Sequence, residues 1–463
     1  MSVTIVPLRI LTIGVLLVAA FTLAHISLAF RSEEEKKKPL SGWRKSMVAP
    51  MAFLGRSIGR AAGFHIVKVV GNPRPSSEVP VVVVAPHSSY FDAFSFFFCA
   101  SIPSTLSREE NSGIPLIGSL IEFTQPVLVK REDPNSRQNT IKEIQRRAQS
   151  GGIWPQIIIF PEGTCTNRQC LINFKPGAFY PGVPVQPVCI RYLNKLDTIT
   201  WTWEGPGAFK VLWFTLCQFN NKIEIEFLPV YSPSEEEIKD PKLFANNVRL
   251  KMAECLRIPT TDHTFDDCRL MQKAAKLKLP KSAGLVEFQK LHNKLSVKFD
   301  DMNVLLDKYG AIAKNKEGNI TIEEFAKYLH LPISDTLQEV FDLYDRDGSG
   351  TIDFREYVIG LSIISTPVNT EETIKLAFEL FDNGNKGHIT QEELCEILYN
   401  AFNMDGLDAE NLFKEVDTDQ DGKISFDEFQ DYALQKPEYA KLFMTYQAKK
   451  NEEKTGNGHP KTE

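Results

Sequence analysis

The chain has 463 residues, enough for two or three domains that each bury a core. Its net charge of −6 is divided unevenly: residues 1–300 carry 37 Lys and Arg against 26 Asp and Glu, whereas residues 301–436 carry 11 against 29. The eight cysteines show no C-x2-C spacing, which favours free thiols of a reducing compartment over a disulfide framework. A basic front part suits anionic headgroups and phosphates, an acidic back part suits cations, and we expect no nucleic-acid partner.

The amino-terminal part, residues 1–64, is expected to meet a membrane. Residues 10–30 form a 21-residue span without Lys, Arg, Asp or Glu, and about 20 apolar residues cross a bilayer. The run is too long for a signal-peptide core, so it predicts a retained signal-anchor. Basic residues after the span place the rest of the chain in the cytosol, although a hairpin inserted from one side has the same pattern. Residues 43–64 alternate apolar and basic side chains, which predicts a helix at the membrane interface or one packed on the protein itself.

Residues 65–276 are predicted to form an α/β domain, because apolar strand-like runs alternate with helical segments. We expect a largely parallel or mixed sheet. The predicted strands are 65–70, 81–85, 126–130, 156–160, 184–190, 198–203 and 223–229. The predicted helices include 135–150, which ends at Gly151 and Gly152, and 240–256, which begins with Asp-Pro.

A histidine and a carboxylate follow the most hydrophobic of these strands. His87 follows the run from Val81 to Ala85 and its bounding Pro86, and Asp92 is five residues further on. Ser88 and Ser89 lie between them as candidate N-caps of a helix. A histidine with a carboxylate one helical turn away is one way to build a general base and the group that orients it.

Other polar side chains lie where further predicted strands end. Arg131 follows one strand, and Glu162, Gly163 and Thr164 follow another, with Arg168 shortly after. Ligands of open α/β sheets gather beyond the carboxyl ends of the strands, so one cleft is expected to hold these groups together with His87. Gly163 permits a ligand to approach the backbone, and the Arg131 guanidinium presents a planar fork to a phosphate.

Four short sequence blocks resemble, taken together, the motifs of one known family. HSSYFD at residues 87–92, KRED around Arg131, FPEGTCTNR at residues 160–168 and VPVQPV at residues 183–188 resemble, in order, the four motifs of glycerophospholipid acyltransferases. The EGTC block is similar to that of lysophosphatidylcholine acyltransferases. The resemblance extends over nearly the whole chain, including the carboxyl-terminal repeats described below.

The resemblance implies an enzyme of phospholipid remodelling that transfers an acyl group from acyl-CoA, its co-substrate, to the free hydroxyl of a lysophospholipid. His87 is then the base, and Asp92 holds its imidazole. The implied substrate-binding residues are Arg131, Glu162, Gly163, Thr164 and Arg168, of which Arg131 binds the phosphate. Residence in the endoplasmic reticulum membrane is implied, with the Golgi or the lipid-droplet surface as alternatives.

Three alternatives remain open at this stage. The acceptor is lysophosphatidylcholine in the leading hypothesis, and lysophosphatidate is a rival. The donor is a long-chain acyl-CoA or, for an ether lysolipid of the lyso-PAF type, acetyl-CoA. The alternative from another class is a calcium-sensing membrane scaffold with an inert acyltransferase domain, but the presence of His87, Asp92, Arg131 and Glu162 argues against it. The apolar residues 208–219 either contact the membrane or form a core helix.

A connector, residues 277–300, leads to repeats of about 35 residues that occupy residues 301–436 and predict an all-α EF-hand domain. Two loops carry a full set of oxygen ligands. In the loop at residues 345–356 the ligands are Asp345, Asp347, Ser349, the Thr351 carbonyl, Asp353 and the bidentate Glu356. In the loop at residues 417–428 they are Asp417, Asp419, Asp421, the Lys423 carbonyl and Glu428. These loops predict two calcium sites of micromolar-range affinity.

Two further copies are degraded. The loop at residues 382–393 has Gly384 and Lys386 where ligands are expected, and the loop at residues 313–324 lacks a carboxylate at its first position. Four copies predict two pairs, each with one competent loop, joined through short ribbons at the eighth loop position. Residues 437–463 are predicted to be a polar tail, and the oligomeric state is left open.

Overall fold

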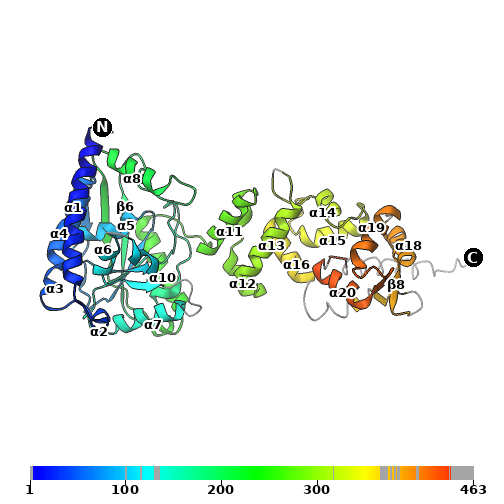
Figure 1. Ribbon diagram of the computed structural model, residues 1–463, viewed down its shortest axis with the longest axis horizontal. Helices are drawn as coiled ribbons and strands as arrows, with labels where there is room; N and C mark the ends of the chain where they lie inside the picture. The colour runs from blue at the N-terminus through cyan, green and yellow to red at the C-terminus, as the bar shows by residue number, and fades with distance from the viewer. Residues whose placement is uncertain are drawn as a thin grey trace, which may run out of the picture. The chain divides into compact units, whose positions relative to one another are not determined.

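The computed structural model describes residues 4–99, 102–114, 117–129, 136–315, 317–364, 374–375, 378–379, 382, 386–402, 406–436 and 438–439. The chain divides into two compact units, Met1–Phe265 and Asp266–Glu463 (Figure 1). Because α11 (Phe265–Lys276) contributes Leu270 and Ala274 to the core of the second unit, the division falls about ten residues earlier than the sequence suggests.

The first unit is built on one mixed sheet of seven strands in the order β1-β7-β6-β2-β5-β3-β4. The strands are β1 (Ile66–Val70), β2 (Val81–Ala85), β3 (Ser104–Arg108), β4 (Val127–Val129), β5 (Ile157–Ile159), β6 (Val185–Tyr192) and β7 (Lys222–Phe227). The five strands from β6 to β4 are parallel, and β7 joins β6 antiparallel. The carboxyl ends of β2, β5 and β6 therefore meet at one edge, and the predicted α/β class is confirmed.

Helices cover both faces of the sheet. On one face α7 (Ser136–Ala148) and α10 (Pro241–Leu256) pack on alternate residues of β2, β5 and β6. On the other face lie α5 (Phe91–Ser95), α8 (Ala208–Cys217) and the amino-terminal end of α1. All five residues of β2 are buried, because the strand is covered from both sides. The short elements are η1 (Phe96–Phe98), η2 (Glu109–Gly113), η3 (Pro176–Ala178) and α9 (Glu235–Lys239).

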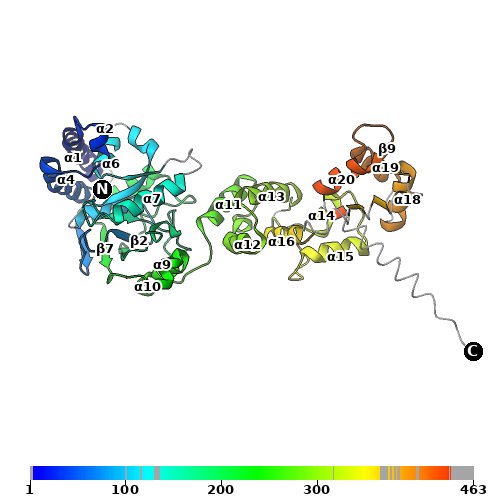
Figure 2. The ribbon, with the colours of Figure 1, turned by 90° about the horizontal axis from the view of Figure 1, so that it is seen from below.

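The amino-terminal helices form one flank of this unit. Among the described residues, α1 (Ile5–Leu28) is the one helix long and apolar enough to cross a membrane, with a mean hydropathy of 2.2. It packs against α4 (Val48–Ala61) and α6 (Ile117–Phe123), and Figures 1 and 2 show α1 and α4 side by side. Its Arg9 donates to the carbonyls of Leu216, Gln218 and Phe219 at 2.5–2.9 Å, which ties α1 to the end of α8. Two short helices, α2 (Glu33–Lys36) and α3 (Gly42–Ser46), lie between α1 and α4.

One predicted strand is wrong, and one strand was missed. Residues 198–203 form a loop, because Asp197 Oδ1 accepts the N–H groups of Ile199 and Thr200, and Trp201 N–H donates to Ser88 O. Strand β3 was not foreseen, because its sequence, STLSR, is mostly polar, yet it lies between β5 and β4. Tertiary pairing overrides the local pattern at both places.

The second unit consists of paired helix–loop–helix repeats around one core. The helices of its first half are α12 (Phe288–Leu295), α13 (Phe299–Ile312), α14 (Ile322–Tyr328), α15 (Asp335–Tyr344) and α16 (Phe354–Ile364), preceded by η4 (Lys281–Gly284). Those of the second half are α18 (Gln391–Phe402), α19 (Gly406–Val416) and α20 (Phe426–Gln435). Ile320 bridges Ile352, and β8 (His388–Thr390) pairs with β9 (Lys423–Ser425) through Ile389 and Ile424. The predicted pairing of the loops at their eighth positions is thereby confirmed.

Candidate active site and calcium loops

His87 lies just beyond the carboxyl end of β2, with its imidazole held on one side by Asp92. Its Nδ1 is 2.9 Å from Asp92 Oδ2, which also accepts the backbone N–H groups of Ser88 and Ser89 at 2.6 and 2.9 Å. Tyr192, the last residue of β6, donates its hydroxyl to Asp92 Oδ1 at 2.7 Å. Because an ionised carboxylate only accepts, the ring donates from Nδ1 and keeps a lone pair on Nε2. This is the arrangement of a general base.

The turn from β2 into α5 differs in one detail from the sequence-based expectation. Helix α5 begins after Tyr90, which makes no side-chain cap, so the prediction of Ser88 or Ser89 as the N-cap is wrong. Both serines instead present their backbone N–H groups to Asp92, whose side chain is fully buried in the first turn of the helix. These hydrogen bonds hold the carboxylate in the position in which it contacts the imidazole.

Glu162 supports His87 from the neighbouring strand. Its Oε1 accepts the backbone N–H of His87 at 2.7 Å, and its side chain is fully buried just beyond β5. Burial, together with the nearby charge of Asp92, raises the pKa of Glu162 to about 8. Gly163 follows with φ +71°, and a Cβ at this position would lie 2.9 Å from Lys175 Cε. The positive φ favours glycine at this position, whereas the close atom is the far end of a flexible lysine side chain that can move.

The residues after Glu162 also contact the histidine. Thr164 is half-buried in the same turn. Cys165 Sγ lies 3.6 Å from His87 Nε2, and Thr166 N–H donates to His87 O at 2.7 Å. The Phe160 ring stacks on the imidazole with 4.1 Å between centroids. The contacts of Cys165 and Thr166 with His87 were missed by the sequence-based reasoning; their position three and four residues after Glu162 was the available signal.

Arg168 contacts Asp197 and the ring of Tyr192, the residue that donates to Asp92. Its guanidinium lies 2.5 Å from Asp197 Oδ2 and 5.6 Å from the centroid of the Tyr192 ring. Burial and the charge of Asp92 raise the pKa of Tyr192, so its hydroxyl remains a donor to that carboxylate. Arg168 is therefore engaged with Asp197 and with the residue that holds Asp92.

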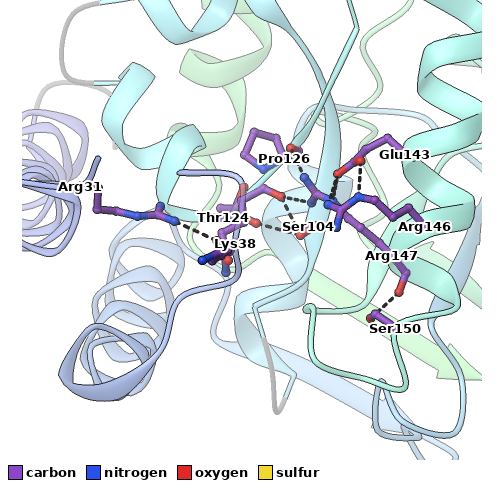
Figure 3. Close-up of polar contacts among 10 residues, drawn as sticks. Arg31, Lys38, Ser104, Thr124, Pro126, Glu143, Arg146, Arg147 and Ser150 are labelled. Carbon is purple, nitrogen blue, oxygen red and sulfur yellow. Dashed lines mark hydrogen bonds and ion pairs between the residues drawn. The ribbon is translucent and has the colours of Figure 1, made fainter. Parts of the chain in front are cut away.

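The predicted phosphate ligand, Arg131, lies outside the described residues. The start of the preceding strand, β4, is held by a buried guanidinium (Figure 3). Arg147 on α7 donates to the carbonyls of Gln125 and Pro126 at 2.5 and 3.1 Å, and Glu143 accepts from its Nε at 2.6 Å. Although burial opposes it, the hydrogen bonds from Arg146 and Arg147 lower the pKa of Glu143. The anchored strand runs parallel to β2 and ends at Val129, so its carboxyl end lies on the same side of the sheet as the carboxyl end of β2, which His87 follows.

Both competent loops of the second unit gather oxygen atoms that fit a calcium ion. One carboxylate oxygen from each of Asp345, Asp347 and Glu356 lies within 4.8 Å of the others, and the same holds for Asp417, Asp419 and Asp421. Asp417 Oδ1 is buried without a hydrogen-bond partner among the residues described, as expected for an atom that awaits a cation. The remaining predicted ligands lie in the same loops: Ser349, Thr351, Asp353, Lys423 and Glu428.

The two degraded loops place nitrogen donors against the carboxylate that would otherwise bind calcium. Lys386 Nζ is 2.7 Å from Glu393 Oε1. Asn315 Nδ2 donates to Glu324 Oε2 at 2.9 Å and to Asn319 O at 2.5 Å. Gly384 lies outside the described residues.

Comparisons with known proteins give this architecture a class. Residues 66–191 match a family model described as "Acyltransferase", residues 337–358 match "EF hand", and residues 371–434 match "EF-hand domain pair". The chain is thus an acyltransferase that carries EF-hands. Among solved structures it is similar to the 1-acyl-sn-glycerophosphate (LPA) acyltransferase PlsC from Thermotoga maritima, with a TM-score of 0.38 and 19% identity over 56% of this chain and 98% of that one.

The curated relatives define the family. The chain is 51% identical to lysophosphatidylcholine acyltransferase 2 of Mus musculus over 96% of its own length and 81% of that protein. It is 50% identical to the Danio rerio protein of the same name, covering 84% of it, and 46% identical to lysophosphatidylcholine acyltransferase 1 of Rattus norvegicus, covering 83% of it. The chain belongs to the lysophosphatidylcholine acyltransferase family.

Proposed function

We propose that the protein transfers an acyl group from acyl-CoA to the free hydroxyl of a lysophospholipid, with lysophosphatidylcholine as the acceptor. The observation that carries the proposal is the 2.9 Å hydrogen bond from His87 Nδ1 to the buried Asp92 carboxylate, which accepts three further hydrogen bonds. Because this bond places the ring proton on Nδ1, Nε2 keeps a lone pair that can accept the proton of a hydroxyl. As the proton moves to Nε2, the hydroxyl oxygen attacks a thioester carbonyl, the C–S bond breaks, and the departing thiolate takes the proton.

The residues around His87 divide into two groups in this proposal. Gly163 and Thr164 form the turn that the acceptor approaches, and Arg131 supplies the cation for its phosphate. Glu162 and Arg168 were expected to bind substrate as well, but their contacts support a positioning role. Glu162 is buried and accepts the backbone N–H of His87, and the guanidinium of Arg168 packs on the Tyr192 ring.

We further propose that the enzyme acts at the cytosolic surface of the endoplasmic reticulum membrane. The outer side of α1 exposes apolar side chains, and α8 beside it exposes Phe209, Trp213 and Phe214. Apolar side chains on two helices joined through Arg9 suit contact with the acyl-chain region of a bilayer. A lysolipid and an acyl-CoA both partition into such a surface.

Two calcium ions complete the proposal, one in each competent loop. Each loop offers the carboxylates, the carbonyl and the position-12 glutamate that calcium requires. Bound calcium would neutralise the clustered carboxylates of the loop. None of the contacts described around His87 involves a residue of these loops.

The test is acyl transfer by the purified full-length protein in lipid vesicles. The panel pairs lysophosphatidylcholine, lysophosphatidate and lyso-PAF with palmitoyl-CoA and acetyl-CoA, each with calcium or chelator. We expect the highest kcat/KM with lysophosphatidylcholine and palmitoyl-CoA. His87→Ala should lower kcat by roughly 10²–10⁴-fold, whereas His65→Ala, an exposed histidine outside the site, should not. Transfer that survives His87→Ala, or no transfer with any pair, refutes the proposal.

A further inference from the structure

Two free thiols meet between the sheet of the first unit and a helix that covers it. Cys189 lies on β6 and is fully buried, whereas Cys255 lies near the end of α10 (Figure 2) and is half-buried. Cys189 Sγ is 3.9 Å from the carbonyl oxygen of Met252, which lies three residues before Cys255 on the same face of α10. The two cysteine side chains are hydrogen-bonded to each other. The fold therefore brings together two thiols that are distant in the sequence.

Charged side chains from two strands surround Cys255. Arg191, two residues after Cys189 on β6, donates from Nη2 to Cys255 O at 2.8 Å and to Cys255 Sγ at 3.1 Å. Glu226 lies on β7, opposite Cys189 in the antiparallel pair. Its Oε2 is 3.2 Å from Cys255 Sγ and 2.6 Å from Arg191 Nη1. A guanidinium, itself held by a carboxylate, is therefore fixed against the sulfur of Cys255.

The two thiols differ in acidity because of these contacts. The hydrogen bond from Cys189 and the guanidinium of Arg191 lower the pKa of Cys255, although burial and the contact with Glu226 oppose them. The same hydrogen bond, together with burial, raises the pKa of Cys189. Cys255 is therefore the thiol that ionises, and Cys189 is the neutral partner that donates to it. A partly exposed thiolate beside a cation is the form of cysteine that reacts with oxidants.

We propose that Cys255 and Cys189 are a peroxide-reactive thiol pair that closes to a disulfide between α10 and β6. The Cys255 thiolate attacks one oxygen of hydrogen peroxide, the O–O bond breaks, and the hydroxide that leaves takes a proton from solvent. Cys255 is then a sulfenic acid. Cys189 Sγ attacks Cys255 Sγ, the S–O bond breaks, and the departing oxygen takes the Cys189 proton and leaves as water. One peroxide is reduced by two electrons to two waters, and the two thiols are oxidised to one disulfide.

The pair is separate from the site proposed for acyl transfer. Cys189 packs on the face of the sheet that α10 covers, whereas Tyr192 lies on the opposite face and contacts Asp92. The bridge would close a loop of the chain that contains α8 and β7. Closing such a loop restricts the unfolded chain and stabilises the fold. We therefore expect oxidation to raise the Tm and to leave kcat unchanged.

The first experiment looks for the bridge in the wild-type protein. Full-length protein in vesicles is treated with hydrogen peroxide, denatured in N-ethylmaleimide, digested without reductant and examined by peptide mass spectrometry. We expect one cross-linked peptide pair that joins Cys189 to Cys255 and is lost on treatment with dithiothreitol. Cys170 is a matched control, because it is also half-buried but its pKa is raised by burial and by the charge of Glu162. It should remain open to the maleimide.

The second experiment assigns the two roles with dimedone, a reagent that traps sulfenic acids. In Cys189→Ser the Cys255 sulfenic acid has no thiol to react with, so peroxide should give a dimedone adduct on Cys255 and no cross-link. In Cys255→Ser neither product should form, and Cys189 should stay a thiol. Cys170→Ser should form the cross-link as the wild type does. The wild-type cross-link decides the question by itself if a variant fails to fold.

The third measurement is stability with and without peroxide. The Tm of the wild type should rise on oxidation and return with dithiothreitol, whereas the Tm of Cys189→Ser should not rise. Peroxide that leaves both thiols open to the maleimide, or that joins Cys255 to a third cysteine, overturns the inference. An oxidised wild type with a lower Tm overturns the stabilising role of the bridge, and one with a lower kcat overturns its separation from the His87 site. The cross-link and the Tm are read without acyl transfer, so failure of the proposed function leaves both tests intact.

Discussion

Tyr192 donates its hydroxyl to Asp92 Oδ1 at 2.7 Å, although one hundred residues separate them in the chain. The contact exists because β6 runs parallel to β2, so that its last residue ends beside the turn that carries His87 and Asp92. The two carboxylate oxygens of Asp92 therefore have different partners. Oδ2 orients the imidazole, and Oδ1 is held by the phenol.

Tyr192→Phe removes this one hydrogen bond and keeps the ring. We expect kcat to fall by about tenfold, the effect of about 1.4 kcal/mol in the transition state, with little change in the KM for acyl-CoA. A double-mutant cycle gives the control, because Tyr192→Phe should have no further effect in a His87→Ala background. Equal losses in both backgrounds would show that Tyr192 supports only the fold.

Glu162 is expected to make stability depend on pH. Its pKa is raised from 4.5 to about 8 by burial, so the folded protein binds a proton there that the unfolded chain has lost. The contribution of Glu162 to the free energy of unfolding is thus full below pH 4.5, falls as the pH rises through this window, and is constant above about pH 8.

Glu162→Gln is the matching substitution, since an amide keeps the shape and remains neutral. The Tm of this variant relative to wild type should rise between pH 4.5 and about pH 8, the two ends of that window. Its amide oxygen still accepts the His87 N–H, so activity at neutral pH should be largely retained. Glu162→Ala should lose both stability and activity. A Tm difference that does not change with pH would exclude a neutral carboxyl at this position.

The local sequence was enough to predict some of these features. The apolar runs of β2, β5 and β6 identified the central strands, and the position of His87 and Asp92 at a strand end led to the proposal of His87 as the base. The calcium loops were predictable because all their ligands lie within twelve consecutive residues. Strand β3 and the loop at residues 198–203 were not, because their conformations depend on distant partners.

The supporting contacts of the site were hidden for a related reason. Tyr192 acts through a register between strands, and Thr166 acts through its backbone N–H, which no side-chain pattern reports. The side chain of Arg168 looked available for an anion until the structure placed Asp197 against it. Sequence motifs identify the reacting groups better than they identify the groups that hold them.

The exposed aromatic side chains of α8 are expected to determine binding to the membrane surface. Phe209 is 90% exposed and Trp213 is 44% exposed. Changing both to Asp should raise the KM for lysolipid presented in vesicles and leave turnover of a monomeric short-chain lysolipid unchanged. The control is Ile238→Asp, which alters an exposed apolar side chain on α9. Equal loss on both substrates would assign these side chains to folding instead.

Calcium binding should depend on the position-12 glutamates of two loops only. Titration calorimetry of the full chain is expected to give two sites of micromolar-range affinity. Glu356→Gln and Glu428→Gln should each remove one site, because each takes a bidentate ligand from a competent loop. Glu324→Gln and Glu393→Gln are the matched controls and should leave two. A stoichiometry that changes with the controls would contradict the assignment of the loops.

The degraded loop at residues 382–393 allows a gain-of-function test. Lys386 Nζ lies 2.7 Å from Glu393 Oε1, so an ammonium group meets the carboxylate that calcium would bind, and these contacts lower the pKa of Glu393 despite the opposing effect of its burial. Lys386→Asp removes the competing cation and adds a ligand at the fifth position. We expect a third calcium site, weaker than the other two because Gly384 still supplies no side-chain oxygen. Lys386→Met separates the two effects, since it removes the cation without adding a ligand and should give no third site. If calorimetry still finds two sites with Lys386→Asp, the missing ligand at Gly384 rather than the lysine keeps calcium out of this loop.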